Sequence, residues 1–550
     1  MPDNATLSSP SFVPDAQPKV CDAVVIGAGF AGLYQLHLLR DRMGLDVQVL
    51  EAASGVGGTW YWNRYPGARC DSESWSYCFQ FDDALVQEWE WSERYPRQPE
   101  ILRYLNHVAD RFDLRRNIRF DTRVASARFD EVANRWLVIT EQGEHFSAPF
   151  LITAVGCLSA ANQPNVPGLE HFRGRWVHTG EWPDEGVDFR GQRVGLIGTG
   201  STGIQAAPVI AAEAQHLSVF QRTPNYSIPA RNHTLDPEFR RRIKQTWPEI
   251  KAKMRGNTNG HPYLIADRET FAVSEQERQA LYEEGWTKGG LSFRATFRDM
   301  MLDASANAEA SAFIQAKIRS IVHDPETAAL LTDFDHPFAT KRPPIDTDYF
   351  ETFNRPNVRL VDIRRNPIAR IGEHGVVLAD GTEVPLDVIV FATGFDAMTG
   401  PLLNIDIVGR EGTRLCDAWA EGPRTYLGLG VEGFPNLFTV TGPGSPSVLT
   451  NMPVAIEQHV EWIAGCVGWL RAHGHARIEA TGEAAAAWGA HVQQVADATL
   501  YPTAKSSWYL GANVPGKPRV FMPYLGGMAR YRAECEAVAA ESYRGFAVGP

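Results

Sequence analysis

The chain has 550 residues. This is too long for a single hydrophobic core and indicates about two to four structural units. Its formal net charge of -12 argues against nucleic acid as a partner. The sequence contains no run of about 18 apolar residues, so we expect no membrane span.

The N-terminus and the cysteines bear on where the protein works. Met1–Lys19 has no charged segment followed by an apolar one, so we predict a flexible tail and not a secretory signal. The 7 cysteines are scattered and form no Cys-x-x-Cys pair, which is typical of reduced thiols in a cytoplasmic protein. No group of His, Cys and carboxylate residues has metal-ligand spacing, so we expect no metal site.

The first part of the chain predicts a strand–helix–strand unit. Cys21–Ile26 is a short apolar run typical of a buried strand, Leu33–Arg40 predicts a helix, and Asp46–Leu50 predicts the next strand. Between the first strand and the helix lie three glycines with dinucleotide-binding spacing, Gly27, Gly29 and Gly32. They allow a tight turn, close approach of a pyrophosphate and close packing of helix on strand. Glu51 ends the second strand, where an acid accepts hydrogen bonds from a ribose 2′-hydroxyl, so we predict FAD binding; a glycine turn without nucleotide is the alternative.

A second such unit follows. Gly191–Ile197 predicts a strand, Gly203–Ala214 a helix and Leu217–Gln221 the next strand. Its turn consists of Gly198, Thr199, Gly200, Ser201, Thr202 and Gly203. Arg222 and Thr223 stand where the first unit has its acid, and they favour a 2′-phosphate, which predicts NADPH here. The alternative for Arg222 is a surface ion pair. Disulfide reductases also carry two such units, but they need a close cysteine pair near the first turn, which is absent.

The rest of the chain completes an α/β fold. Charged helical stretches at Asp236–Lys253 and Ser274–Glu284 predict a helical insertion, and the βαβ pattern resumes at Asn357–Asp362 and continues through Gly375–Leu378. Asp387–Asp396 predicts a strand that returns the chain to the first domain, followed by helices at Pro453–Ala472 and Ala484–Ala498. We therefore predict two Rossmann-like dinucleotide-binding domains, with a flexible tail at 1–19, an FAD domain at 20–155 and 387–550, an NADP domain at 156–231 and 335–386, and a helical insertion in the NADP domain at 232–334.

A fingerprint lies between the two glycine turns. Phe172–Pro183 has the pattern F-x-G-x-x-x-H-T-x-x-W-P, with His178 in its centre. Together with Trp60–Asp71 and Trp508–Asn513, it resembles the type I Baeyer–Villiger monooxygenases, in particular the phenylacetone and steroid monooxygenase types. The resemblance runs from about Val20 to the C-terminus. It implies an enzyme that uses FAD, NADPH and O₂ to convert aryl-aliphatic, cyclic or steroid-like ketones into esters or lactones.

That chemistry requires a permanent cation beside the flavin. A C4a-peroxyflavin must stay deprotonated to attack the ketone, and the resulting negative charge must be stabilised. Arg342 in Ala339–Pro343 is the candidate, because Arg stays charged in an apolar pocket and the resemblance points to the same residue. Asp71 matches the family's acid that pairs with this arginine. The alternatives are a solvated basic pair at 341–342 and an Asp that caps the next segment.

The resemblance assigns further residues. It places Thr59, Trp60, Asp71 and Tyr77 at the FAD, Lys341 and Trp508 at the NADP, and Leu158, Leu449, Thr450 and Met452 in the ketone pocket. His178 is expected to couple domain motion to cofactor state and not to act as a general base. Sulfoxidation is expected as a side activity. The alternatives are a flavin-dependent N- or S-oxygenase and a non-catalytic flavin-binding protein, and we expect a monomer or weak homo-oligomer whose partners are the ketone and O₂.

Overall fold

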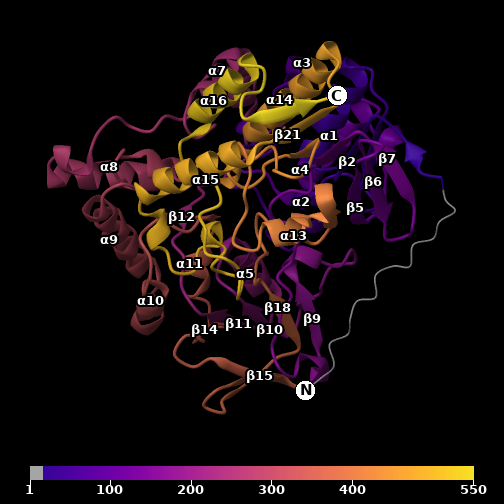
Figure 1. The fold of residues 1–550 in the computed structure, drawn as a ribbon. Coiled ribbons are helices and arrows are strands. Elements are labelled where there is room, and N and C mark those ends of the chain that lie inside the picture. Colours follow the sequence, from indigo (N-terminus) through magenta and orange to yellow (C-terminus); the bar gives the residue numbers. More distant parts are fainter. Residues whose placement is uncertain (1–16) are drawn as a thin grey trace.

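In the computed structural model of the protein, residues 17–550 are described (Figure 1). The predicted flexible tail therefore lies, except for residues 17–19, outside the described residues. Lys19 already belongs to a strand, β1 (Lys19–Val20), which pairs in parallel with β7 (His145–Ala148). All 7 cysteines have free thiols.

The first domain is built on a five-stranded parallel sheet. In sheet order its strands are β20 (Leu437–Thr439), β8 (Phe150–Thr153), β2 (Ala23–Ile26), β3 (Val47–Leu50) and β4 (Ile118–Arg119). The residues of β2 and β8 are all buried, as expected for central strands covered on both faces. The crossover helix α1 (Phe30–His37) packs against α14 (Met452–His473) on one face. A second sheet, β1-β7-β6-β5-β19, covers the other, with β5 (Val124–Asp130), β6 (Arg135–Thr140) and β19 (Asp406–Val408).

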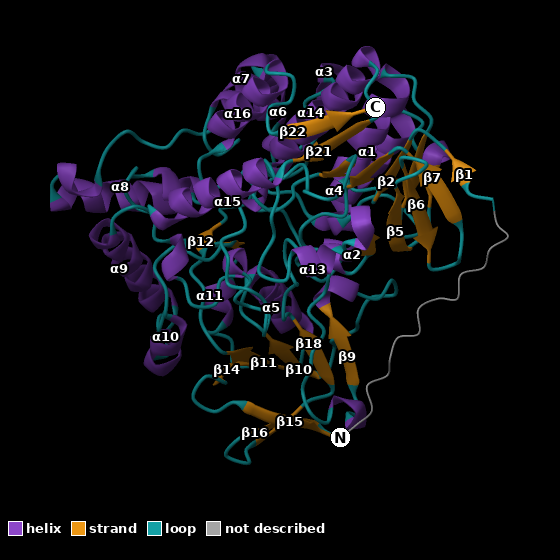
Figure 2. Ribbon diagram, in the orientation of Figure 1, coloured by secondary structure: helices purple, strands orange, loops and turns teal. Residues whose placement is uncertain are grey.

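The second domain repeats this plan, which confirms the predicted pair of Rossmann-like units. Its parallel sheet has the order β14 (Val358–Asp362), β11 (His216–Gln221), β10 (Arg193–Ile197), β18 (Val388–Phe391) and β9 (Arg175–His178). The crossover helix is α5 (Ser201–Glu213). Figure 2 shows this sheet in the lower part of the molecule and the sheets of the first domain at upper right.

Two predicted assignments around this sheet are wrong. β18 pairs with β10 and β9, so the chain is still in the second domain after residue 387, where a return to the first domain was predicted. A buried apolar run predicts a parallel strand but does not specify which sheet it joins. Gly375–Leu378 does not continue the βαβ pattern either. It forms β16 of a three-stranded antiparallel sheet with β15 (Ile368–Gly372) and β17 (Glu383–Pro385), which packs on the second domain through Phe220 and Phe391.

The predicted helical insertion is divided between the two domains. Helices α8 (Glu275–Lys288), α9 (Ala304–Ile321) and α10 (Pro325–Leu331) bury their apolar side chains in the core of the second domain. α6 (Pro237–Gln245) and α7 (Trp247–Gly256) instead pack on the core of the first domain. In Figure 1, α7 accordingly lies beside α16 (Met528–Ala540), far from α10. The helices were predicted correctly, but the assignment of residues 237–256 to the NADP domain is wrong.

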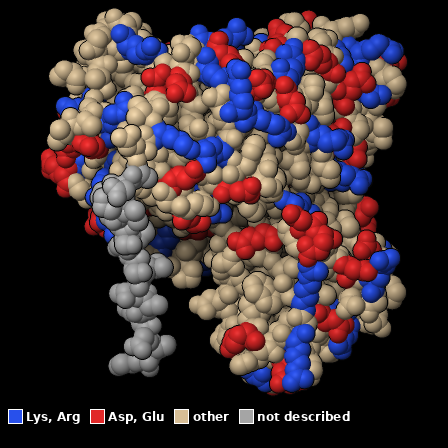
Figure 3. All heavy atoms as spheres, turned by 90° about the vertical axis from the view of Figure 1, so that its right-hand side faces the viewer, with Lys and Arg blue, Asp and Glu red and all other residues tan. Residues whose placement is uncertain are grey.

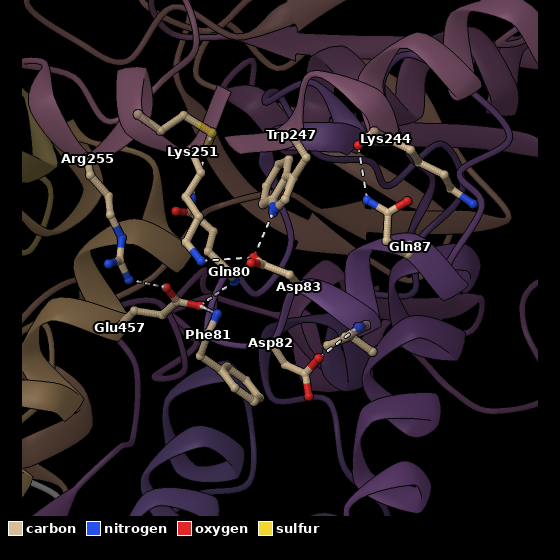
Figure 4. Close-up of polar contacts among 12 residues, drawn as sticks. Gln80, Phe81, Asp82, Asp83, Gln87, Lys244, Trp247, Lys251, Arg255 and Glu457 are labelled. Carbon is tan, nitrogen blue, oxygen red and sulfur yellow. Dashed lines mark hydrogen bonds and ion pairs between the residues drawn. The ribbon is translucent and has the colours of Figure 1, made fainter. Parts of the chain in front are cut away.

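Polar contacts attach α7 to the first domain (Figure 4). Trp247 Nε1 and Lys251 Nζ both donate to Asp83 Oδ1, at 3.2 and 2.9 Å. Arg255 forms an ion pair of 3.5 Å with Glu457, whose other carboxylate oxygen accepts hydrogen bonds from the amides of residues 80 and 81. Glu457 is only 1% exposed, and this burial raises its pKa to about 7. The C-terminus of α7 is thus held against α14.

Acidic and basic side chains are intermixed on the face shown in Figure 3. Among the helices of residues 17–550, none combines the length and apolar character needed to cross a membrane. No group of three or more metal-ligating side chains converges within the same residues.

The two glycine turns have the same geometry. Gly27 and Gly198 have φ values of +103° and +118°, which favour glycine. A Cβ atom on Gly32 would lie 1.8 Å from the carbonyl oxygen of Gly27, and one on Gly203 would lie 2.1 Å from that of Gly198. The third glycine of each turn therefore allows the helix to pack on the turn.

Gly203→Ala should lower the free energy of unfolding of the second domain by about 1–3 kcal/mol, because the added methyl group overlaps a backbone carbonyl. Gly200→Ala is the matched control, since no atom lies within 4 Å of its Cβ position, and it should stay within about 0.5 kcal/mol of the wild type. Urea and thermal unfolding of the purified variants measure both effects. Equal losses would contradict this account of the turn.

Glu457→Gln should weaken the pH dependence of stability. Because burial raises the pKa of Glu457 from 4.5 to about 7, the folded state retains a proton in this pH range that the unfolded state has lost. This stability is fully present below pH 4.5 and is lost as the pH rises through about 7. Gln cannot lose a proton, so the unfolding free energy of the variant should fall less between about pH 5 and 8, by roughly 1–3 kcal/mol. Identical pH slopes in denaturant unfolding would argue against a raised pKa.

Candidate active site

One large cavity lies where the two parallel sheets end. It has a volume of about 930 Å³ and is lined by both glycine turns, residues 341–343, residues 448–450 and parts of the segment 506–513. Parallel sheets bind ligands at the carboxyl ends of their strands, and β2 and β10 both end here. Every predicted site residue lines this cavity except Gly32 and Gly203, which pack beneath their turns.

The turn of the first domain fits the phosphates and ribose of FAD. Gly29 lines the cavity beside the N-terminus of α1, where a pyrophosphate can approach the backbone, and a Cβ there would already contact Gly58 at 3.4 Å. Glu51 is buried at the end of β3, where its two oxygens accept hydrogen bonds from the amides of Ala28 and Ala53 at 2.6 and 2.8 Å. These bonds hold the carboxylate in place for a ribose hydroxyl. Thr59 and Trp60 begin the short helix α2 (Thr59–Trp62) on the same wall, and Trp60 Nε1 donates to the Tyr77 hydroxyl at 3.2 Å.

The turn of the second domain fits a nucleotide with an additional phosphate. No atom lies within 4 Å of the Cβ position of Gly200, and Thr199 Oγ1 donates to the carbonyl of Thr223 at 2.8 Å. Burial lowers the pKa of Lys341, and the nearby cation Arg222 lowers it further, although Asp335 at 3.4 Å opposes both. Lys341 and Arg222 repel each other, and a dianionic group bound between them would stabilise both charges. The 2′-phosphate of NADPH is such a group.

Arg342 and Asp71 form an ion pair at the centre of the cavity. Arg342 Nε lies 3.3 Å from Asp71 Oδ2, and Arg342 Nη1 donates to the carbonyl of Val448 at 3.2 Å. Burial lowers the pKa of Arg342, but Asp71, together with Tyr509 and Cys70, raises it by more, and the net shift is upward. Asn225 Nδ2 donates to the Arg342 carbonyl and fixes the backbone at this position. The side chain is therefore a permanent cation in the cavity that both nucleotide turns also line.

The predicted ketone wall is largely apolar. Leu158, Leu449 and Met452 pack on one buried cluster, and Trp508, which was predicted at the NADP, packs on the same cluster. Thr450 also lines the cavity, but its hydroxyl donates to the carbonyl of Asn259 at 2.8 Å and thereby supports a neighbouring loop.

The divided insertion supplies a third wall of the cavity, which was not predicted from the sequence. His261, Tyr263 and Arg294 line the cavity, although no site residue was predicted between 232 and 334. The sequence signal was present in the Asn- and Gly-rich stretch 257–260, which is typical of a loop, and loops often carry functional side chains.

His178 of the fingerprint has a structural arrangement. The Gly180 amide donates to Nδ1 at 3.1 Å, so the proton lies on Nε2, which donates to Thr393 Oγ1 at 3.1 Å. Thr393 donates in turn to the carbonyl of Asn162. Burial lowers the pKa of His178, so the ring is neutral. The ring therefore joins the end of β9 to the segment after β18, and the fingerprint is partly an edge strand and not only a linker.

The segment that carries Trp508 contacts the same region. Ser507 Oγ donates to the carbonyl of Thr340 at 3.3 Å, next to the Arg342 loop. Asn513 Nδ2 donates to the carbonyl of Phe395 at 2.9 Å, two residues after Thr393. The fingerprint, the Arg342 loop and the Trp508 segment thus form one connected set of contacts.

Comparison with known proteins gives matches along nearly the whole chain. Residues 24–282 match the family of pyridine nucleotide-disulphide oxidoreductases. The chain is 47% identical to the acetone monooxygenase (methyl acetate-forming) of Gordonia sp. (strain TY-5), over 96% of this chain and 99% of the relative. It is 43% identical to the cyclohexanone 1,2-monooxygenase of Acinetobacter sp., over 96% of both chains.

A solved structure of oxidized steroid monooxygenase bound to NADP is 53% identical, with a TM-score of 0.92 over 96% of this chain and 100% of that one. The closed structure of cyclohexanone monooxygenase is 46% identical, with a TM-score of 0.94 over 97% of this chain and 99% of that one. These matches confirm the predicted fold class, the FAD and NADP cofactors and the resemblance. The chain is a flavin-dependent oxidoreductase that belongs to the Baeyer–Villiger monooxygenase family.

Proposed function

We propose that this monooxygenase converts aryl-aliphatic, cyclic or steroid-like ketones into esters or lactones with NADPH and O₂, and that Arg342 is its catalytic cation. The observation that carries this proposal is the Arg342–Asp71 ion pair, which lines the same cavity as the two dinucleotide turns. Relatives named for acetone and cyclohexanone, and a structure named for steroid oxidation, support the range of ketones.

Each group has a defined task in this proposal. The flavin, when bound, supplies the activated oxygen. Arg342 stabilises the negative charge that develops on the ketone oxygen, because a preorganised cation in a site screened from water needs no reorganisation during the reaction. Asp71 orients the guanidinium, and Leu158, Leu449 and Met452 hold the apolar part of the ketone. Arg222, Thr223 and Lys341 bind the 2′-phosphate of NADPH.

N-oxygenation is a second candidate activity. The chain is 44% identical to a phenazine N-monooxygenase of Lysobacter antibioticus, over 96% of both chains. Both N-oxygenation and the expected sulfoxidation need an electrophilic oxygen donor, which the bound flavin would supply. Product analysis with a ketone, a thioether and a phenazine ranks the three activities. The cytoplasmic location and the monomeric or weakly oligomeric state stay predictions from the sequence.

Arg342→Ala should reduce ester formation by at least about 100-fold, because the developing negative charge loses its fixed cation. Flavin content should be unchanged, and NADPH consumption should continue with release of H₂O₂. Product yield and H₂O₂ per NADPH oxidised measure the outcome. Arg190→Ala removes an exposed cation that pairs with Asp188 and is the control for net charge. Ester formation near the wild-type rate in the Arg342 variant would remove this residue from the mechanism.

Arg222→Ala should lower kcat/KM for NADPH by roughly 10- to 100-fold, since a charge-assisted contact to the 2′-phosphate is lost. The value for NADH, which lacks that phosphate, should hardly change. Steady-state kinetics with both coenzymes give the ratio. If both values fall equally, Arg222 does not recognise the phosphate.

A further inference from the structure

A second arginine lies in the cavity, and no role in the proposed reaction accounts for it. Arg294 belongs to the short 3₁₀ helix Leu291–Ala295 and lines the same cavity as Arg342. Its Nη2 donates to the hydroxyl of Tyr501 at 3.0 Å, and its Nε is buried without a hydrogen-bond partner among the described residues.

The surroundings of Arg294 differ from those of Arg342. Arg342 has the Asp71 carboxylate, whereas the charged and titratable groups that act most strongly on Arg294 are three tyrosines and Arg342 itself. The tyrosines are Tyr501, Tyr263 and Tyr509. None of these groups is a carboxylate, so an anionic ligand would be the first full negative charge to pair with this guanidinium.

An unpaired ring nitrogen lies on the same wall. His261 is 6% exposed, and its Nδ1 is buried without a hydrogen-bond partner among residues 17–550. Burial, together with Arg342 and Arg294, lowers the pKa of His261 to about 3, so the imidazole is neutral. It stacks on Tyr263, with ring centroids 5.2 Å apart. A neutral imidazole has one N–H group and can therefore donate one hydrogen bond to a ligand.

The loop that carries His261 is held in place on both sides. Asn257 Oδ1 accepts from the amide of Gly260 at 2.7 Å, and Asn259 Oδ1 accepts from the amide of His261 at 2.8 Å. The Asn259 carbonyl accepts from Thr450 Oγ1, on the predicted ketone wall. The loop follows directly after α7, which the Arg255–Glu457 ion pair attaches to the first domain. These contacts attach the His261 loop both to the first domain and to the predicted ketone wall.

We propose that Arg294 and His261 form a subsite for a carboxylate, so that the preferred ketones are keto acids whose carboxylate is remote from the reacting carbonyl. A planar guanidinium binds a carboxylate with charge-assisted hydrogen bonds, and the ring N–H of His261 supplies another. Arg342 and Arg294 then divide the work: the first acts on the carbonyl and the second on the far end of the molecule. The inference rests on the proposed ketone oxidation.

The test compares one keto acid with its ester. Holoenzyme is assayed with 6-oxoheptanoate and with methyl 6-oxoheptanoate, whose ketones have the same reactivity. The wild type should prefer the acid, and Arg294→Met should lower kcat/KM for the acid by about 10- to 100-fold while the ester changes by less than about threefold. Arg298→Gln is the matched control, because Arg298 is exposed four residues away and pairs with Asp267 and Glu269. It should leave both values unchanged.

Binding gives a readout that does not depend on turnover. Calorimetry with heptanoate, which has no ketone, should show binding to the NADP⁺-loaded holoenzyme that Arg294→Met and His261→Phe weaken at least about tenfold. Flavin content and melting temperature confirm that the variants are folded. If wild-type enzyme oxidises neither ketone, the proposed function fails, and heptanoate binding still decides the subsite. An unchanged acid-to-ester ratio in Arg294→Met, or a raised KM for NADPH as its sole effect, would overturn the inference.

Discussion

The ion pair between Arg342 and Asp71 is the interaction on which the active site depends. Asp71 belongs to the first domain and Arg342 follows the helices of the second, so that 271 residues separate partners whose charged atoms lie 3.3 Å apart. Burying either charge alone would be costly, and together they compensate much of that cost. The pair keeps a permanent cation in the cavity and at the same time joins the two domains.

The divided insertion explains how the remaining wall of the cavity is positioned. α7 is fixed to the core of the first domain through Asp83 and Glu457, whereas α8–α10 are buried in the core of the second. The loop that leaves α7 brings His261 into the cavity, and the 3₁₀ helix after α8 brings Arg294. The insertion is therefore a bridge between the domains, and it supplies one wall of the cavity.

The hydrogen bonds of the fingerprint also connect the second domain to the cavity. His178 is neutral and connects β9 to the segment after β18, and that segment accepts a hydrogen bond from Asn513 near Trp508. A change in the position of the second domain would reach both the Arg342 loop and the Trp508 segment through these bonds. A neutral histidine with both ring nitrogens engaged suits this structural task better than proton transfer.

The sequence by itself determined the two nucleotide-binding units and indicated NADPH for the second. These depend on local patterns: short apolar runs, glycine spacing that a Cβ atom would disrupt, and an Arg in place of an acid after the second strand. Arg342 and Asp71 have no such local pattern and were predicted mainly from the resemblance to a known family. Only the tertiary structure decided that β18 stays in the second sheet, that residues 237–256 join the first domain, and that His261 and Arg294 enter the cavity. The physical reason is that an apolar strand or an amphipathic helix encodes which face is buried, but not which of two similar cores will bury it. Partners distant in the chain, such as Arg294 and Tyr501, leave no periodic signal, and only the folded chain brings them together.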